Sequence, residues 1–468
     1  MMKTTEKNFK DSSTIINEIA TTSDTLSSRG GLSLFVRYLR NIALAPHLER
    51  LFGSMRKSAK RQPVTEIFKQ LFCFFLDGTS RHLVYFDKLK EDEGYAAAIE
   101  SSPKAMLSSH AVKRFFCAFS WYRIWLFRPL LQQLFLWRLK LRNPEVILLG
   151  IDTMVMDNNE AEKRHGVQPT YKKVKGFQPL QMTWERYVID AVFRGGKKHG
   201  NHGDTVIKMV RHMVSEIRNN YRQEVPIVVR LDSGFYDQKL FEVFEELGIG
   251  YICSGKLYKD ITEYVEKTDQ SAWGRYQNGE QAWDFLEFGD RRDSWSKTRR
   301  AFYCRPVYEG IQHLLSFARP EKIIYTNLGM GDRIDDQLEI AGLIDLFKPE
   351  KIIECGHSRG RDELVHRALK EFGQETLPFK RFAPNTAYYY SMLLAFFIYE
   401  SFLEDVCVEV VPIGSYATTL RRKVIDIAAK IVRTSGKIIL KVTSAAWKQL
   451  KIDILWQKSG DPPLFAWA

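Results

Sequence analysis

The segment SRGRDELVHRALKEFG, residues 358–373, places one carboxylate among several cations. If it is helical, Glu363 lies one turn after Arg359 and two turns before Lys370, so all three fall close to one stripe. In one interpretation this is a solvated face with i,i+4 ion pairs, each worth about 0.2–0.5 kcal/mol. In the other, Glu363 holds a metal ion and the cations hold the phosphates of a polyanion. The rest of the sequence has to decide between them.

Two aspartates far upstream follow apolar, β-branched runs that predict buried strands. Asp152 follows EVILLGI, and Asp232 follows VPIVVRL. Taken alone, an aspartate at the end of a strand is most often a turn residue or a helix cap. Carboxylates are nevertheless the ligands that Mg²⁺ prefers, and two such ions about 3.5–4 Å apart can manage the attacking and leaving oxygens of a phosphodiester. If the two strands are neighbours and a helix packs against their ends, Asp152, Asp232 and Glu363 form one metal site.

The elements that must position these residues follow an α/β order. Residues 145–259 predict three strands, a helix, a strand, a helix and a short strand, and residues 323–404 predict a further strand followed by helices. Between them, residues 260–322 are rich in Trp, Tyr and Phe with Asn-Gly and Gly-Asp turns, which favours an antiparallel β insertion. Upstream, residues 31–144 have a helical period, and residues 1–30 form a polar tail that we expect to be disordered. The remainder, 405–468, predicts a helix–strand region.

The charge of the chain favours a polyanionic partner. The 468 residues carry a formal net charge of +13, spread over short basic clusters along the whole sequence. A membrane-binding protein would concentrate these charges in one amphipathic segment, so nucleic acid is the better interpretation. No stretch approaches the ~20 apolar residues of a membrane span, and the sequence lacks the G-K-[ST] ending of a nucleotide-binding loop. We therefore expect no membrane partner and no nucleotide cofactor.

Several other residues are candidates for contact with nucleic acid, each with a structural alternative. Lys113 and Arg114 lie on a helix with a plausible N-cap at Ser109, either a helix-turn-helix reader or part of an ordinary bundle. A second basic group consists of Lys172, Lys173 and Lys175. These lysines either contact a phosphate backbone or are ordinary surface charge. Trp283, like Trp273 and Trp295, is most simply the core of a small sheet, with stacking on a flipped base as the alternative.

Short motifs in the same order resemble those of DDE-type bacterial insertion-sequence transposases. RLDSGF with YICSGK after it resembles the second-aspartate region, and LGIDTMVMDNNE…YKKVKGFQPL resembles the first. The R-x3-E-x6-K pattern at Arg359, Glu363 and Lys370 is similar to the last three positions of the YREK signature of that superfamily. Segments near both ends also resemble the family, which extends the likeness to nearly the whole chain. The signature tyrosine falls at Gly356, so His357 either replaces its phosphate contact or lies in a helix-capping loop.

This resemblance implies a fold, an activity and a set of partners. The expected fold is a ribonuclease H-like core, a mixed sheet flanked by helices, with a β-rich insertion and an N-terminal all-α domain. Asp152, Asp232 and Glu363 would bind two Mg²⁺ ions, with Mn²⁺ as a substitute. The enzyme would cleave phosphodiesters at transposon ends and join the 3′-OH to target DNA.

The implied partners are double-stranded DNA, both terminal inverted repeats and target, and a second copy in a dimeric synaptic complex. The implied location is the bacterial cytoplasm, in association with the nucleoid. Two alternatives stay open: a domesticated protein that binds and bridges DNA without catalysis, and a structure-specific nuclease of the same fold.

Overall fold

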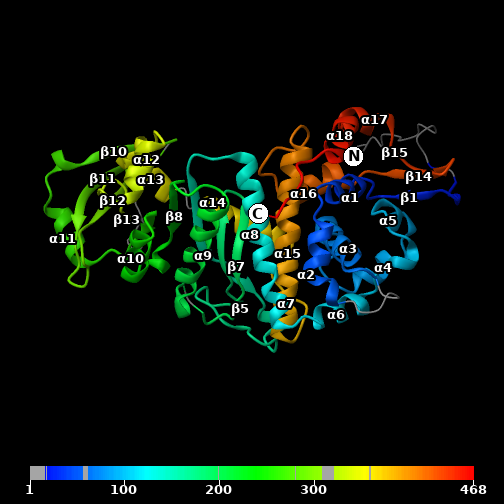
Figure 1. The fold of residues 1–468 in the computed structure, drawn as a ribbon, viewed down its shortest axis with the longest axis horizontal. Helices are drawn as coiled ribbons and strands as arrows, with labels where there is room; N and C mark the ends of the chain where they lie inside the picture. The colour runs from blue at the N-terminus through cyan, green and yellow to red at the C-terminus, as the bar shows by residue number, and fades with distance from the viewer. Residues whose placement is uncertain are drawn as a thin grey trace, which may run out of the picture.

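The computed structural model is elongated, with the elements of residues 250–340 at one end and the first helices and last strands at the other (Figure 1). It describes residues 16, 18–55, 62–198, 200–279, 281–307, 321–357 and 360–467, excepting the side chains of 360–362. No helix in this described part is both long and apolar enough to cross a membrane.

A single mixed sheet runs through the middle of the molecule. In the described residues it has nine strands in the order β10-β11-β12-β13-β9-β8-β2-β6-β7. Their bounds are β2 (Ile147–Thr153), β6 (Leu180–Trp184), β7 (Tyr187–Val192), β8 (Ile227–Leu231), β9 (Gly250–Ser254), β10 (Gly274–Asn278), β11 (Gln281–Asp290), β12 (Arg299–Val307) and β13 (Lys322–Thr326). The first three form an antiparallel meander, while β8 and β9 run parallel to β2. This confirms the predicted mixed sheet of the α/β class.

Helices cover the sheet because its strands are apolar on both faces. Helix α9 (Thr205–Asn220) carries the chain from β7 past β6 and β2 to β8, and α10 (Gln238–Glu246) makes the crossover between the parallel neighbours β8 and β9. On one face, Ile252 and Ile324 of the sheet pack with residues of α12 (Arg333–Ile340) and α13 (Pro349–His357). Next along the chain come α14 (Gly360–Phe372) and the long α15 (Phe382–Phe402).

The aromatic-rich segment 260–322 does not build a separate small sheet. After α11 (Lys259–Lys267), strands β10 to β12 continue the central sheet, because β12 pairs with β13 and β13 pairs with β9. Trp295 is accordingly buried against Tyr236 and Tyr325, which belong to the core rather than to the insertion. The insertion and the rest of the central sheet thus share one set of backbone hydrogen bonds.

The N-terminal region is helical and is tied to the C-terminal region. Its helices are α1 (Leu32–Asn41), α2 (Ala45–Phe52), α3 (Val64–Asp77), α4 (Tyr85–Glu91), α5 (Glu93–Ala98), α6 (Ser109–Cys117), α7 (Trp121–Trp125) and α8 (Phe127–Arg142). The C-terminal elements are α16 (Ala417–Leu420), β14 (Ala429–Thr434), β15 (Lys437–Lys441), α17 (Ser444–Gln449) and α18 (Ile452–Gly460). Helix α1 packs against α18, in the right half of the molecule as drawn in Figure 1.

The expectation of a disordered tail up to residue 30 is wrong at its end. Thr25–Ser27 form β1, which pairs with Ala429–Ile431 of β14. A three-residue strand has too little local signal to be predicted, because its stability comes from a partner about 400 positions away.

Candidate active site

The ends of β2 and β8 bring Asp152 and Asp232 to one edge of the sheet. The two strands run parallel with Ile151 opposite Leu231, so the next residue of each strand emerges at the same place. The carboxylate Oδ1 of Asp152 accepts a hydrogen bond from the Thr153 amide at 2.6 Å, and Oδ1 of Asp232 accepts from the Gly234 amide at 2.8 Å. The prediction that these strands are neighbours is confirmed.

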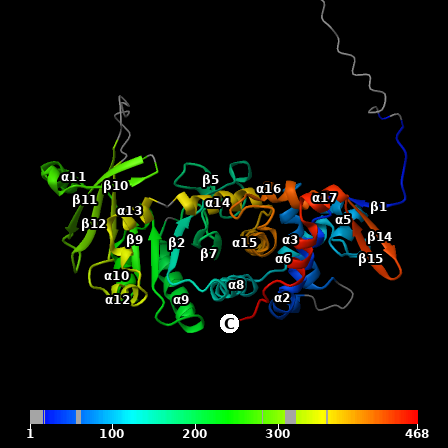
Figure 2. The same cartoon turned by 90° about the horizontal axis from the view of Figure 1, so that it is seen from above.

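Helix α14 lies across the end of β2 (Figure 2). Its Val365 and Leu369 are buried, whereas Glu363 is exposed. The buried His366, only 8% exposed, places Nδ1 3.8 Å from Oδ2 of Asp152. Since Glu363 precedes His366 by one helical turn, the two side chains leave neighbouring positions on the helix. The helix that carries the glutamate therefore adjoins the first aspartate.

His366 was missed from the sequence because the stripe was defined by charge alone. The available signal was the Glu-x-x-His spacing, which places a second potential polar ligand or partner one turn after the glutamate. No periodicity indicates which strand end such a histidine will face. The contact with Asp152 depends on the packing of α14.

The three carboxylates do not make a closed ligand cluster. Within the described part of the chain, no group of three Asp, Glu, His or Cys side chains converges closely enough to hold a metal ion. The two aspartates at the sheet edge nevertheless offer oxygen ligands, with the His366 imidazole beside Asp152. Cys253, whose Sγ lies 3.5 Å from the Asp232 carbonyl oxygen, is buried, and burial together with the nearby Asp232 charge raises the pKa of its thiol. A hard cation such as Mg²⁺ fits this donor set better than a thiolate-seeking metal.

The structure supports only part of the predicted stripe of DNA-binding cations on α14. Arg359 lies outside the described residues. Lys370 is one-third exposed and forms an ion pair with Glu375 at 2.8 Å. Glu375 also accepts a hydrogen bond from the amide of Asp157, five residues after the first aspartate. Lys370 therefore lies near the candidate site but shares its charge with a carboxylate.

The other basic candidates lie on the surface of two different regions. Lys175 begins β5 (Lys175–Phe177) and pairs with Glu162, while Lys172 and Lys173 are exposed in the turn that joins β5 to β4 (Gln168–Pro169). Lys113 and Arg114 are exposed on α6. The cap of α6 is Ser108 rather than Ser109, because Ser108 accepts from the Ala111 amide whereas Ser109 is bonded to Asp87.

Gly356 and His357, at the signature tyrosine position, form the last turn of α13 and not a loop. A Cβ at Gly356 would lie 2.6 Å from Cδ1 of Ile324, so a tyrosine at this position would require the Ile324 side chain to move. Burial, with the charge of Lys322, lowers the pKa of His357 to about 4. A neutral imidazole cannot supply a positive charge to a phosphate, so a cationic phosphate contact by His357 is not supported.

Trp283 packs against His357, with ring centroids 4.3 Å apart, and Lys322 Nζ lies 5.8 Å from its ring centroid. The side chain is partly buried, on a sheet strand next to α13. This contact joins β11 to the helix that precedes α14. The surroundings of Trp283 therefore agree with a packing role in the sheet.

Comparison with known proteins assigns the chain to a family. Residues 14–457 match the family model described as Transposase DDE domain group 1. A solved structure, the cryo-EM piggyBac transposase synaptic complex with hairpin DNA, is similar over 85% of this chain and 79% of that chain, at 11% sequence identity and a TM-score of 0.35. No curated protein sequence matches the chain significantly.

Proposed function

Since this chain belongs to the DDE transposases and is a DNA transposase, we propose that Asp152, Asp232 and Glu363 are its catalytic carboxylates. The observation that carries this proposal is the parallel register of β2 and β8, which brings both aspartates to one edge beside α14. Enzymes of this family depend on divalent cations and act as polynucleotidyl transferases and nucleases. The proposal assigns that chemistry to named side chains.

Two Mg²⁺ ions are the proposed cofactors, with Mn²⁺ able to substitute. Asp152, Asp232 and Glu363 would supply oxygen ligands, and the protonated Cys253 thiol would not compete. The ions would activate the attacking oxygen and stabilise the leaving oxygen of an in-line displacement. Backbone N–H groups of Thr153 and Gly234 hold the first two carboxylates in position.

The remaining residues would bind and orient the nucleic acid. Lys370, close to the sheet edge, is proposed to contact a phosphate as a point charge, and Arg359 to contact one bidentately. On this scheme the enzyme cleaves at the transposon ends and transfers the 3′-OH to target DNA. Because two ends have to be joined, we place two copies of the chain in the synaptic complex, bound to terminal inverted repeats and target duplex.

One observation favours a second candidate, a DNA-binding and bridging protein without catalysis. The described residues contain no cluster of three potential metal ligands, and the same absence is expected of an inactive site. An open site that closes on substrate would look the same, because catalytic contacts are often long before substrate binds. Activity measurements separate the two.

The test is cleavage of a DNA duplex that carries the terminal inverted repeat. The sequence of this repeat is taken from the DNA that flanks the coding region. We expect Asp152→Asn, Asp232→Asn and Glu363→Gln each to lower the cleavage rate by at least about 1,000-fold and to keep end binding. Glu160→Gln, an exposed carboxylate close to Asp152 in sequence, is the matched control and should cut normally. Normal cutting by the three variants would refute the assignment. Joined products with a supplied 3′-OH end and target DNA distinguish a transposase from a nuclease.

A further inference from the structure

Helix α7 exposes three large aromatic side chains on one short element. Trp121 is 59% exposed, Tyr122 72% and Trp125 57%, whereas Ile124 anchors the helix in the core at 3%. Trp121 and Trp125 are one turn apart, as are Tyr122 and Trp125, so the rings form a continuous face. Single exposed apolar residues are ordinary, but a contiguous aromatic face on a rigid element usually marks an interaction site.

The aromatic face packs on the core at Phe382, which two exposed cations precede in the sequence. The ring of Trp121 lies 6.1 Å from that of Phe382, which itself packs against Phe193 at 5.1 Å. Phe382 begins α15 directly after Lys380 and Arg381, and both of these side chains are exposed. Among the ion pairs of the described residues, none involves Lys380 or Arg381. Their charges are therefore available to an anionic partner.

The loop that contains Lys380 and Arg381 connects this surface with the candidate active site. Residues 373–381 run from the end of α14 to the start of α15, and their Glu375 pairs with Lys370. The amide of His165 donates to the carbonyl of Lys380 at 2.8 Å, which fixes the loop to the segment that follows β3 (Met156–Asp157). In Figure 1, α7 lies beside the lower end of α15. A bound polymer could therefore contact both places.

We infer that α7, with Lys380 and Arg381, is a surface for DNA beyond the catalytic carboxylates. It rests on the proposed function and extends the path of the DNA away from the reacting phosphate. Lys380 and Arg381 contact backbone phosphates, and the rings of Trp121, Tyr122 and Trp125 contact sugars and exposed bases. A second copy of the chain fits less well, because a twofold contact on this face would bring the uncompensated cations of both copies together.

The first experiment measures binding of a fluorescein-labelled, random-sequence DNA duplex with single-stranded tails by the full chain in EDTA, using anisotropy over a range of salt concentrations. We expect Trp121→Ala/Trp125→Ala to weaken binding about tenfold or more. Lys380→Ala/Arg381→Ala should also lower the salt slope by about two. Trp447→Ala, a tryptophan 47% exposed on α17, is the matched control and should bind as the wild type does.

The second experiment identifies the contact itself. Photocrosslinking to DNA that contains 5-iododeoxyuridine, followed by trypsin and mass spectrometry, should label peptide 115–123 or 124–138, since trypsin does not cut between Arg128 and Pro129. If the double tryptophan variant has a lowered melting temperature, Tyr122→Ser serves in its place, since that side chain is the most exposed of the three. Unchanged DNA affinity in these variants, or a change only in oligomeric state, would overturn the inference.

Failure of this inference is separable from failure of the proposed function. Binding in EDTA needs no metal ion and no carboxylate ligand, so Asp152→Asn should bind as tightly as the wild type. If the α7 variants bind normally but the carboxylate variants do not cut, only the DNA surface is refuted. If the carboxylate variants cut while the α7 variants lose binding, only the assignment of the catalytic residues is refuted.

Discussion

At the scale of single residues, the side chain beside Asp152 is the main finding. His366 is buried, and its Nδ1 faces Oδ2 of Asp152 at 3.8 Å, longer than a hydrogen bond. The other carboxylate oxygen is already bonded to the Thr153 amide. His366 is thus placed to orient the carboxylate from the helix that also carries Glu363. Outer-shell partners of this kind tune a metal ligand without binding the metal themselves.

We expect His366→Leu to lower the cleavage rate by about 10–100-fold and to raise the Mn²⁺ concentration needed for half-maximal binding. His366→Asn retains a polar nitrogen near the position of Nδ1 and should recover most of both losses. His366→Gln places its nitrogen further along the side chain and should recover less. The measurements are cleavage rates over a Mn²⁺ series and calorimetric Mn²⁺ binding. Equal Mn²⁺ affinity in His366→Leu and wild type would contradict a positioning role.

At the scale of elements, α15 and the π-helical turn that continues it carry two carboxylates whose ionisation differs although they lie one turn apart. Burial raises the pKa of Glu400 to about 7, and Arg186 at 2.9 Å limits this rise. Burial also opposes ionisation of Glu404, at the start of the π-helical turn Leu403–Cys407. There, hydrogen bonds from Arg142 and Tyr187 and the charge of Arg138 instead hold the pKa at about 2. Glu400 therefore resists ionisation, whereas the contacts of Glu404 favour its ionised form.

The two groups predict opposite pH dependence of stability. Between pH 4.5 and 7 the folded chain keeps the Glu400 proton and the unfolded chain releases it, so the free energy of unfolding falls as pH rises. Glu400→Gln should remove this loss and gain up to about 3 kcal/mol on the wild type between pH 4.5 and 8. Glu404 contributes stability above pH 4.5 that is lost as pH falls towards 2. Glu404→Gln should therefore be destabilised at neutral pH.

Urea unfolding of the wild type and both variants at several pH values measures these differences. Parallel stability curves for Glu400→Gln and wild type would show that the buried carboxyl does not titrate as described. A Glu404→Gln variant as stable as the wild type at pH 7 would show that the arginine contacts do not favour its ionised form.

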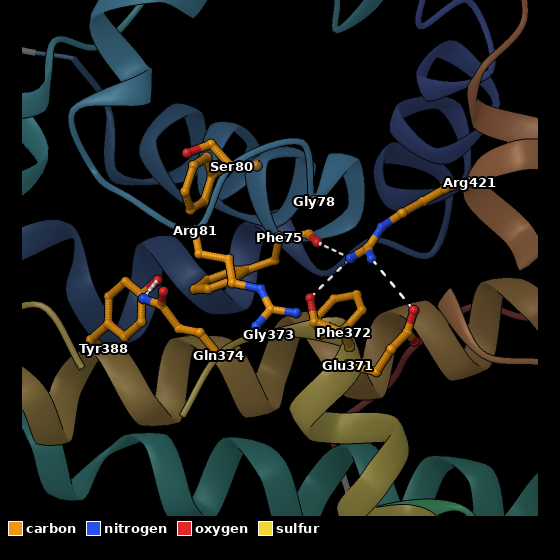
Figure 3. Close-up of a pocket in the computed structure, with 11 residues that line it drawn as sticks. Phe75, Gly78, Ser80, Arg81, Glu371, Phe372, Gly373, Gln374, Tyr388 and Arg421 are labelled. Atoms are coloured by element: carbon orange, nitrogen blue, oxygen red, sulfur yellow. Dashed lines mark hydrogen bonds and ion pairs between the residues drawn. The ribbon is translucent and has the colours of Figure 1, made fainter. Parts of the chain in front are cut away.

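At the scale of the whole molecule, Arg421 joins three regions that are distant in sequence (Figure 3). Its guanidinium donates to the carbonyls of Phe75 and Leu76 in the last turn of α3, at 3.0 and 2.8 Å, and to the carbonyl of Phe372, which ends α14, at 2.9 Å. Carbonyls at a helix C-terminus lack partners within the helix and attract a cation. One arginine from the C-terminal region thus fixes the glutamate-bearing helix to the N-terminal bundle.

Arg421→Met should leave these buried carbonyls unsatisfied and lower the free energy of unfolding by about 3 kcal/mol or more. It should also increase hydrogen–deuterium exchange in the last turn of α14 and reduce cleavage. Arg422→Met, the exposed neighbour, is the matched control and should change neither. Exchange and urea unfolding are the two measurements. Unaltered exchange in α14 would show that this contact does not restrain the helix.

The sequence alone determined the order of strands and helices in the core and the positions of the two aspartates. Both follow from local information: apolar, β-branched runs require burial as strands, and a polar residue after such a run lies at the edge of a sheet. The Glu363 helix was also predictable, because its buried Val365 and Leu369 recur at helical spacing.

Only the tertiary structure decided which elements meet. The pairing of β13 with β9, the pairing of β1 with β14, the contact of His366 with Asp152 and the partner of Lys370 all join residues that local patterns treat separately. A strand edge offers the same backbone groups to every possible neighbour, and a surface cation offers the same charge to every carboxylate. The choice among partners is made when the apolar faces pack together, so it is a property of the whole chain.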